Sequence, residues 1–150
     1  MQDNRFMRVA LEMAHMAGAA GEVPVGAVLV LNGEIIARAH NQPIRLHDPT
    51  AHAEVVALRQ GGQAVENYRL SECELYVTIE PCIMCMGALL HARIRRLIFG
   101  ALDPRMGAAG TLYDLSCDPR LNHAVEVDAG LMEDECRSVL QEFFKEKRKK

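Results

Sequence analysis

Three side chains of the kinds that bind zinc stand out in the sequence: His52, Cys82 and Cys85. Cysteine sulfur and histidine nitrogen are preferred zinc ligands, and a catalytic zinc site uses three protein ligands and keeps a fourth position for water. The two cysteines are three residues apart and follow Pro81, a residue favoured in the first turn of a helix. The dipole of such a helix start favours thiolates. We therefore expect these three side chains to hold one zinc ion.

Glu54 lies two residues after His52, on another side of the first turn of a predicted helix. One of the two side chains can therefore bind a metal while the other stays free. A carboxylate that is beside a metal site but not bound to the metal can take a proton from water and return it to a substrate. We interpret Glu54 as the acid-base residue of a hydrolytic active site.

Neither half of this constellation is specific by itself. A Cys-x-x-Cys pair also serves thioredoxin-type redox centres and structural zinc knuckles, and a His-x-Glu pair is common by chance. Here His52-x-Glu54 is followed, after 26 residues, by Pro81-Cys82-x-x-Cys85. This is the known pattern of zinc deaminases that act on cytosine or adenine.

The elements in the first half of the chain follow from periodicity and turn residues. Apolar spacing predicts a helix from residue 5 to about 18. Two β-branched runs, 23–31 and 34–39, flank Asn32-Gly33 and predict a β-hairpin. Residues 40–51 contain two prolines and predict an ordered loop. A helix is expected from His52 to about residue 60, with Thr50 as its N-cap and Gly61-Gly62 as its stop.

The second half predicts a strand-helix-strand unit with strands at 73–79 and 95–101 and a helix at 81–93. A long connection, 102–123, is expected to contain one turn of helix. A short strand at 124–130 and an amphipathic helix at 131–147 complete the chain. We expect one α/β domain over 1–150, a three-layer α-β-α sandwich around a mixed five-stranded sheet.

Composition restricts the class of protein. The chain is 49% hydrophobic and 25% charged, as in ordinary globular proteins, and its net charge of -3 gives no global attraction to nucleic acid. We find neither a signal peptide nor an apolar run of about 18 residues, so we expect a cytoplasmic protein that does not enter membranes. The basic tail at about 145–150 is the one local feature suited to phosphates. Cys73, Cys117 and Cys136 are not assigned to zinc.

Beyond the metal pattern, the chain resembles the bacterial tRNA-specific adenosine deaminases from about Glu22 to near its C-terminus. The matching segments are, in order, EVPVGAVLV, HDPTAHAE, ALRQGG, NYRL, LYVTIEPCIMC, GAAGTLYDL and DECRSVLQEFF. The resemblance implies a cytidine-deaminase-like fold and hydrolytic conversion of adenosine to inosine at the wobble position of a tRNA anticodon. It also implies one zinc ion per subunit and a homodimer that binds the anticodon stem-loop.

The same resemblance implies roles for individual residues. Asn41 is expected to hydrogen-bond the flipped nucleoside, and the backbone at Ala51 is expected to read the edge of the base. The pocket walls and the acid near the ribose are expected to be Val25, Ile79, Pro81 and Asp103. The expected RNA contacts in the last helix are Phe144, Lys145, Lys147 and Arg148.

Three alternatives remain open on the sequence. The first is a deaminase of a free base or nucleoside, of the guanine or cytosine type, that uses the same metal site. The second is a non-enzymatic zinc-binding or nucleic-acid-binding module with a structural metal. The third is a redox enzyme based on Cys82 and Cys85, which would leave His52 and Glu54 without a role.

Overall fold

The computed structural model describes residues 2–149 and consists of five strands and five helices. In chain order these are α1 (Gln2–Ala19), β1 (Gly26–Leu31), β2 (Glu34–His40), α2 (Pro43–Leu46), α3 (Ala53–Val65), β3 (Cys73–Ile79), α4 (Ile83–Ala92), β4 (Arg96–Ala101), β5 (Glu126–Ala129) and α5 (Glu133–Arg148).

The five strands form one mixed sheet in the order β2-β1-β3-β4-β5. β1 pairs antiparallel with both β2 and β3, whereas β3, β4 and β5 run parallel. The turn between β1 and β2 is made by Asn32 and Gly33, both at positive φ, as the two-residue hairpin requires. The predicted hairpin, the strand-helix-strand unit and the mixed five-stranded sheet are thereby confirmed.

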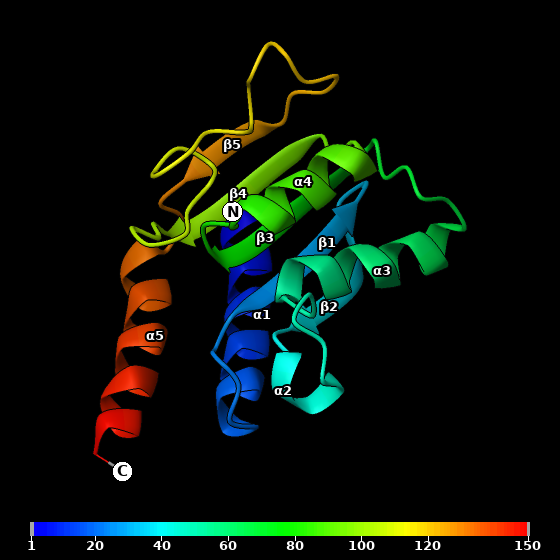
Figure 1. Cartoon of the computed structure of the whole chain (residues 1–150). Coiled ribbons are helices and arrows are strands. Elements are labelled where there is room, and N and C mark those ends of the chain that lie inside the picture. The colour runs from blue at the N-terminus through cyan, green and yellow to red at the C-terminus, as the bar shows by residue number, and fades with distance from the viewer. Residues whose placement is uncertain (1, 150) are drawn as a thin grey trace.

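Helices cover both faces of the sheet, so its strands alternate between two hydrophobic cores. Leu75 and Val77 of β3 face the core shared with α3 and α4, while Tyr76 between them faces the core shared with α1 and α5. Figure 1 shows this arrangement, with α3 and α4 in front of the sheet and α1 behind it. The predicted three-layer sandwich is confirmed. Both α3 and α4 begin near the same end of β3 in this view, which brings their N-termini together.

The start and the end of α3 differ from the prediction. Gly61 does not stop the helix, because it is where α3 packs most closely on the sheet: a Cβ there would lie 2.2 Å from Leu29 Cδ2. The helix continues to Val65 and ends with Glu66 in the left-handed conformation. Thr50 is not the N-cap, because its hydroxyl donates to Asp48. The N-cap is His52, whose side chain makes no capping hydrogen bond.

Three further details of the loops also differ from the prediction. Residues 43–46, expected to be loop, form the short helix α2, with Pro43 at its start. The 102–123 connection contains turns and an isolated bridge between Ala109 and Asp114, but no helical turn. Pro81 precedes α4 instead of forming its first turn, and Cys82 is the N-cap. Cys82 therefore lies in extended backbone at the N-terminus of α4.

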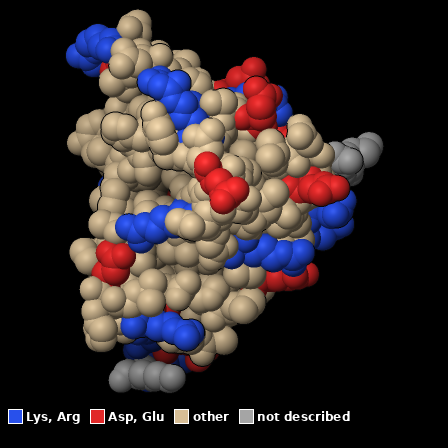
Figure 2. Space-filling model, turned by 90° about the vertical axis from the view of Figure 1, so that its right-hand side faces the viewer, with Lys and Arg blue, Asp and Glu red and all other residues tan. Residues whose placement is uncertain are grey.

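The described residues are characterised by the length and hydropathy of their helices and by their surface charge. Within residues 2–149 no helix is long and apolar enough to cross a membrane. Basic and acidic side chains are interspersed with uncharged ones on the face seen in Figure 2, without an extended region of one sign. This pattern agrees with the small net charge of -3.

Candidate active site

His52, Cys82 and Cys85 converge from the starts of two helices. His52 is the N-cap of α3, Cys82 is the N-cap of α4, and Cys85 lies in the first turn of α4. The Sγ atoms of Cys82 and Cys85 lie 3.7 and 3.5 Å from His52 Nδ1. Within residues 2–149 this is the one group of histidine, cysteine or acidic side chains whose ligand atoms all lie within 4.8 Å of one another. The structure thus brings together the three expected metal ligands.

The spacing of these atoms can be compared with the needs of zinc. Bonds of about 2.3 Å to sulfur and about 2.0 Å to nitrogen, at tetrahedral angles, place ligand atoms roughly 3.5 to 3.8 Å apart. The distances from His52 Nδ1 fall in this range. The group contains two thiols and one imidazole, with no fourth protein ligand among the described residues. The donor set fits a zinc ion that keeps one position open.

The three side chains differ in how readily they lose the proton that a metal ion would replace. Hydrogen bonds from Cys85 and His52 lower the pKa of Cys82 to about 4, so this thiol is ionised at neutral pH. The pKa of Cys85 is raised, first by its hydrogen bond to the Cys82 thiolate and then by burial. The pKa of His52 is raised chiefly by its hydrogen bond with Cys82. Metal binding therefore has to release the proton that the pair of thiols retains.

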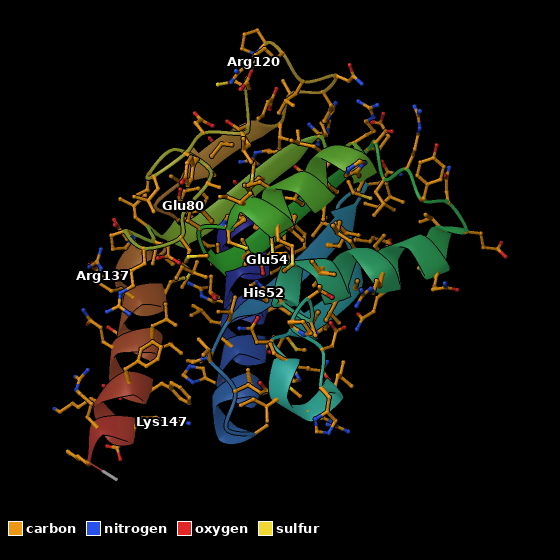
Figure 3. The ribbon with its side chains drawn as sticks, viewed as in Figure 1. His52, Glu54, Glu80, Arg120, Arg137 and Lys147 are labelled. Atoms are coloured by element: carbon orange, nitrogen blue, oxygen red, sulfur yellow. The ribbon has the colours of Figure 1, made fainter. Side chains whose placement is uncertain are left out.

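Glu54 is buried beside this group, with 3% of its surface exposed. It lies in the first turn of α3, and Figure 3 shows it next to His52, where α3 and α4 begin. Burial raises the pKa of the Glu54 carboxyl to about 6. Its carboxyl also forms a hydrogen bond with Cys85. A carboxyl that titrates near neutral pH is suited to both accept and donate a proton.

Asn41 fixes the start of the helix that carries His52 and Glu54. Its Oδ1 accepts a hydrogen bond of 2.8 Å from the backbone N–H of Ala53, the first residue of α3. The side-chain nitrogen of Asn41 has no hydrogen-bond partner among the described residues. Every buried side-chain nitrogen of these residues does have a partner, so the nitrogen of Asn41 is accessible from outside. The amide N–H groups of Asn41 are therefore free to bind a ligand.

The other expected pocket residues lie around the same helix starts. The backbone of Ala51 is used within the protein: its carbonyl accepts from Gln42 N and its N–H donates to Asp48 O. Its carbonyl has a second lone pair for a ligand. Val25 is buried, and its carbonyl accepts from Asn41 N. Ile79 is half-buried at the end of β3, two residues before the buried Pro81.

The expected acidic residue near the ribose is engaged in its own loop. Asp103 Oδ1 accepts from the backbone N–H groups of Arg105 and Met106, which closes the turn after β4. Its own N–H donates to Glu80 Oε1 at 3.0 Å. Asp103 therefore helps to hold the conformation of the loop 103–111, of which it is the first residue.

The expected RNA contacts in α5 are not brought to the metal group. Phe144, Lys145, Lys147 and Arg148 are all exposed. They lie on α5, which packs on the opposite face of the sheet from α3 and α4, and Figure 3 shows Lys147 well separated from His52. Lys150, the last residue of the predicted basic tail, lies outside the described residues.

Two buried glutamates that organise the site were missed by the sequence reasoning. Glu22 accepts hydrogen bonds from the backbone of Ile44 and Arg45 and so holds α2. Glu80 accepts from the backbone of the loop after β4. The signal for Glu80 was its place between an apolar strand and Pro81, where a carboxylate is buried only if it is well hydrogen-bonded.

Comparison with known proteins agrees with this geometry. Residues 1–101 match the family model of the cytidine and deoxycytidylate deaminase zinc-binding region. The tRNA-specific adenosine deaminase of Haemophilus influenzae is 50% identical over 97% of this chain and 85% of its own. That of Bacillus subtilis is 47% identical over 99% of this chain and 92% of its own.

Solved structures give the same result. One from work on A-to-I editing by tRNA:A34 deaminases at the wobble position has a TM-score of 0.88 and 46% identity, covering 91% of this chain and 99% of that one. A guanine deaminase from Nitrosomonas europaea has a TM-score of 0.78 and 26% identity, covering 93% of this chain and 83% of that one. The chain belongs to the zinc-binding cytidine and deoxycytidylate deaminase family and, within it, to the tRNA-specific adenosine deaminases.

Proposed function

We propose that this protein hydrolyses adenosine to inosine, with release of ammonia, at the wobble position of tRNA anticodons. The observation that carries the proposal is the three-ligand group His52, Cys82 and Cys85 with the buried, unligated Glu54 beside it. Guanine deaminases share the fold, so the choice of substrate is supported instead by the 50% identity to a tRNA-specific adenosine deaminase.

In the proposed reaction, the protein's own residues bind the metal and move protons. Zinc, when held by His52, Cys82 and Cys85, polarises a water molecule and so supplies a nucleophile near neutral pH. The Glu54 carboxylate takes one proton from the water and delivers it to N1 of adenine. Glu54 then takes the remaining proton of the added hydroxyl group and delivers it to the leaving amine, so that water and adenosine yield inosine and ammonia. A pKa of about 6 lets Glu54 serve both steps.

Substrate recognition is proposed to depend on the polar groups around the helix starts. The free amide N–H groups of Asn41 are suited to an acceptor of the nucleoside, and the carbonyl of Ala51 is suited to a donor on the base edge. Val25, Ile79 and Pro81 supply apolar walls, as stacking of an unpaired base requires. The basic side chains of α5 are proposed to contact phosphates of the stem.

The structure offers little support for the alternative classes. A structural zinc site is closed by a fourth protein ligand, and the group contains three within residues 2–149. A redox pair would need neither His52 nor the buried Glu54. Deamination of a free base stays the second candidate, because the guanine deaminase from Nitrosomonas europaea shares the fold at 26% identity.

We further propose one zinc ion per subunit, a single domain over 1–150, and action as a cytoplasmic homodimer. An open groove runs between α3 and α4 on the outer face of the sandwich, and its lining combines apolar residues such as Val55, Leu58 and Ala88 with polar ones such as Arg59 and Gln63. Apolar side chains at an open helix pair are suited to a second copy of the chain. Sedimentation at several concentrations checks the dimer, which predicts a mass of about twice 16.6 kDa.

The substrate proposal is tested by comparing substrates with one zinc-loaded preparation. Anticodon stem-loops with adenosine or cytidine at the wobble position, free adenosine, free guanine and free cytidine are each incubated with the protein, and the products are separated by mass. The proposal expects inosine from the adenosine stem-loop alone. Turnover of guanine or cytidine without turnover of the stem-loop would replace it with the free-base alternative.

A further inference from the structure

Glu80 joins the segment that carries Cys82 to the loop after β4. It is 2% exposed and follows the last residue of β3. Oε1 accepts from the N–H of Asp103 at 3.0 Å and from the Thr111 hydroxyl. Oε2 accepts from the N–H groups of Ala109 and Thr111, both at 3.0 Å. One carboxylate therefore holds both ends of the loop 103–111.

The same loop is also bonded directly to the metal-binding segment. The N–H of Ala108 donates to the carbonyl of Pro81 at 2.9 Å, one residue before Cys82. The N–H of Glu80 donates to the carbonyl of Ala101 at 2.9 Å, which fixes Glu80 to the end of β4. A shift of the loop would therefore displace Pro81, and a shift of Pro81 would move the Cys82 thiol.

Gly107 shows how closely the loop is packed on this carboxylate. A Cβ at Gly107 would lie 2.4 Å from both Cδ and Oε1 of Glu80, and 2.5 Å from the carbonyl oxygen of Asp103. Real Cβ atoms do not approach other atoms so closely, so an alanine at this position must push the carboxylate or the loop away. The absence of a side chain at Gly107 therefore allows the loop to pack directly on the Glu80 carboxylate.

We propose that Glu80 is a positioning residue for deamination: its carboxylate holds the loop 103–111 as a fixed wall of the substrate site and keeps Cys82 in place. This inference rests on the proposed function for its kinetic readout. Glu80 does not touch the reacting atoms. It acts through the N–H groups of Asp103, Ala109 and Thr111 and through the carbonyl of Pro81.

The four hydrogen bonds predict a graded series of variants. In Glu80→Gln, an amide nitrogen at the Oε2 position would face two N–H donors, so the amide turns to the Oε1 position. In that position the amide nitrogen faces only one N–H donor, that of Asp103. The Thr111 hydroxyl can rotate and accept a hydrogen bond from the amide. Glu80→Gln therefore loses one bond, whereas Glu80→Ala loses all four. Asp114→Asn is the matched control, because Asp114 holds a turn in the same connection through Ser116 and has no hydrogen bond to residues 80–82.

The first measurement is amide hydrogen exchange together with zinc content, which needs no activity. We expect the amides of Ala109 and Thr111 to exchange faster in Glu80→Ala than in the unchanged protein. In Glu80→Gln these two amides should exchange at close to the rate of the unchanged protein. In Asp114→Asn their exchange should not change. Unchanged exchange of these amides in Glu80→Ala would overturn the inference, whatever the substrate of the protein is.

The second measurement is kinetic and is made on zinc-loaded protein well below the unfolding temperature. We expect kcat/KM for the stem-loop to fall about 10-fold in Glu80→Gln and about 100-fold in Glu80→Ala, because small misplacements in a site have effects of this size. Gly107→Ala should lower it as well, and the double variant Glu80→Gln/Gly107→Ala should fall by less than the product of the two single effects.

The outcomes separate this inference from the proposed function. If the unchanged protein forms no inosine, the proposed function fails and the exchange data still decide the role of Glu80. If the unchanged protein is active and Glu80→Ala retains its kcat/KM, or if the two single effects multiply, the positioning role is wrong. Loss of activity in Asp114→Asn equal to that in Glu80→Ala would also overturn it.

Discussion

Replacing Asn41 separates two roles that the structure gives to one side chain. Asn41 Oδ1 caps the backbone N–H of Ala53 at 2.8 Å, and Ala53 is fully buried. In Asn41→Ala this N–H loses its partner in the protein. An unpaired buried donor costs about 1–3 kcal/mol, and a lost helix cap costs about 1 kcal/mol. We take about 2 kcal/mol, which for a chain of this length lowers the unfolding temperature by about 4–8 °C.

Asn41→Asp keeps the oxygen and removes only the amide N–H groups. A carboxylate is an equally good cap, and its charge at the N-terminus of α3 is favourable. The unfolding temperature should therefore stay within about 2 °C of that of the unchanged protein. The proposed donor to the nucleoside is lost, so kcat/KM for the stem-loop should fall at least about 10-fold, the equivalent of one hydrogen bond.

The assay is calorimetric unfolding and inosine formation on the same three zinc-loaded preparations. The reasoning expects Asn41→Ala to be less stable and less active, and Asn41→Asp to be as stable but less active. An unchanged unfolding temperature in Asn41→Ala would refute the capping argument. Full turnover in Asn41→Asp would refute the proposed contact with the substrate.

Three further predictions concern the metal, the packing and the pH dependence. Chelation should abolish turnover, and Cys82→Ser should lose zinc. Cys117→Ser should keep both zinc and activity, because that thiol is exposed and outside the metal-binding group. Zinc analysis of the purified variants checks this. Gly26→Ala should cost about 3 kcal/mol or more in denaturant unfolding, because its Cβ would lie 1.9 Å from a backbone oxygen of α1. The Arg96 guanidinium holds the pKa of Asp3 below its usual value, so this carboxylate stabilises the fold above about pH 3.8 and less as the pH falls below it. Asp3→Asn should then cost at most about 1 kcal/mol at pH 7, since Asp3 is partly exposed, and the difference from the unchanged protein should shrink in unfolding curves at lower pH.

The sequence was sufficient to predict the architecture because its local signals agree with one another. Asn32-Gly33 between two β-branched runs indicated the hairpin, and the apolar strands beside helical stripes indicated a sheet covered on both faces. The metal ligands could be predicted as a set because the chemistry of zinc restricts both residue type and spacing. The structure then placed the side chains of His52 and Cys85 within 3.5 Å, although they are 33 residues apart.

Features that depend on contacts distant in sequence could not be predicted. Gly61 indicated a helix end by its propensity, but its role is to let α3 approach Leu29. Thr50 fitted the position of a cap, but the oxygen that caps the start of α3 comes from Asn41. Propensity describes a residue and its neighbours, so it cannot show which distant side chain supplies a hydrogen bond.

The buried glutamates show the same limit within the site. Nothing in the sequence around Glu80 indicates that its partners lie in the residues 103–111. The proposed RNA contacts in α5 were likewise taken from resemblance, and the structure places them on the other layer from the metal group.

The most direct test of the central claim is inosine formation in an anticodon stem-loop with adenosine at the wobble position, measured by mass for the unchanged protein and Glu54→Ala at equal zinc content. The account predicts inosine from the unchanged protein, and turnover by Glu54→Ala lower by about 100-fold or more, the usual contribution of a general acid-base residue. Equal turnover by the two proteins would contradict the role of Glu54, and no inosine from either would contradict the substrate.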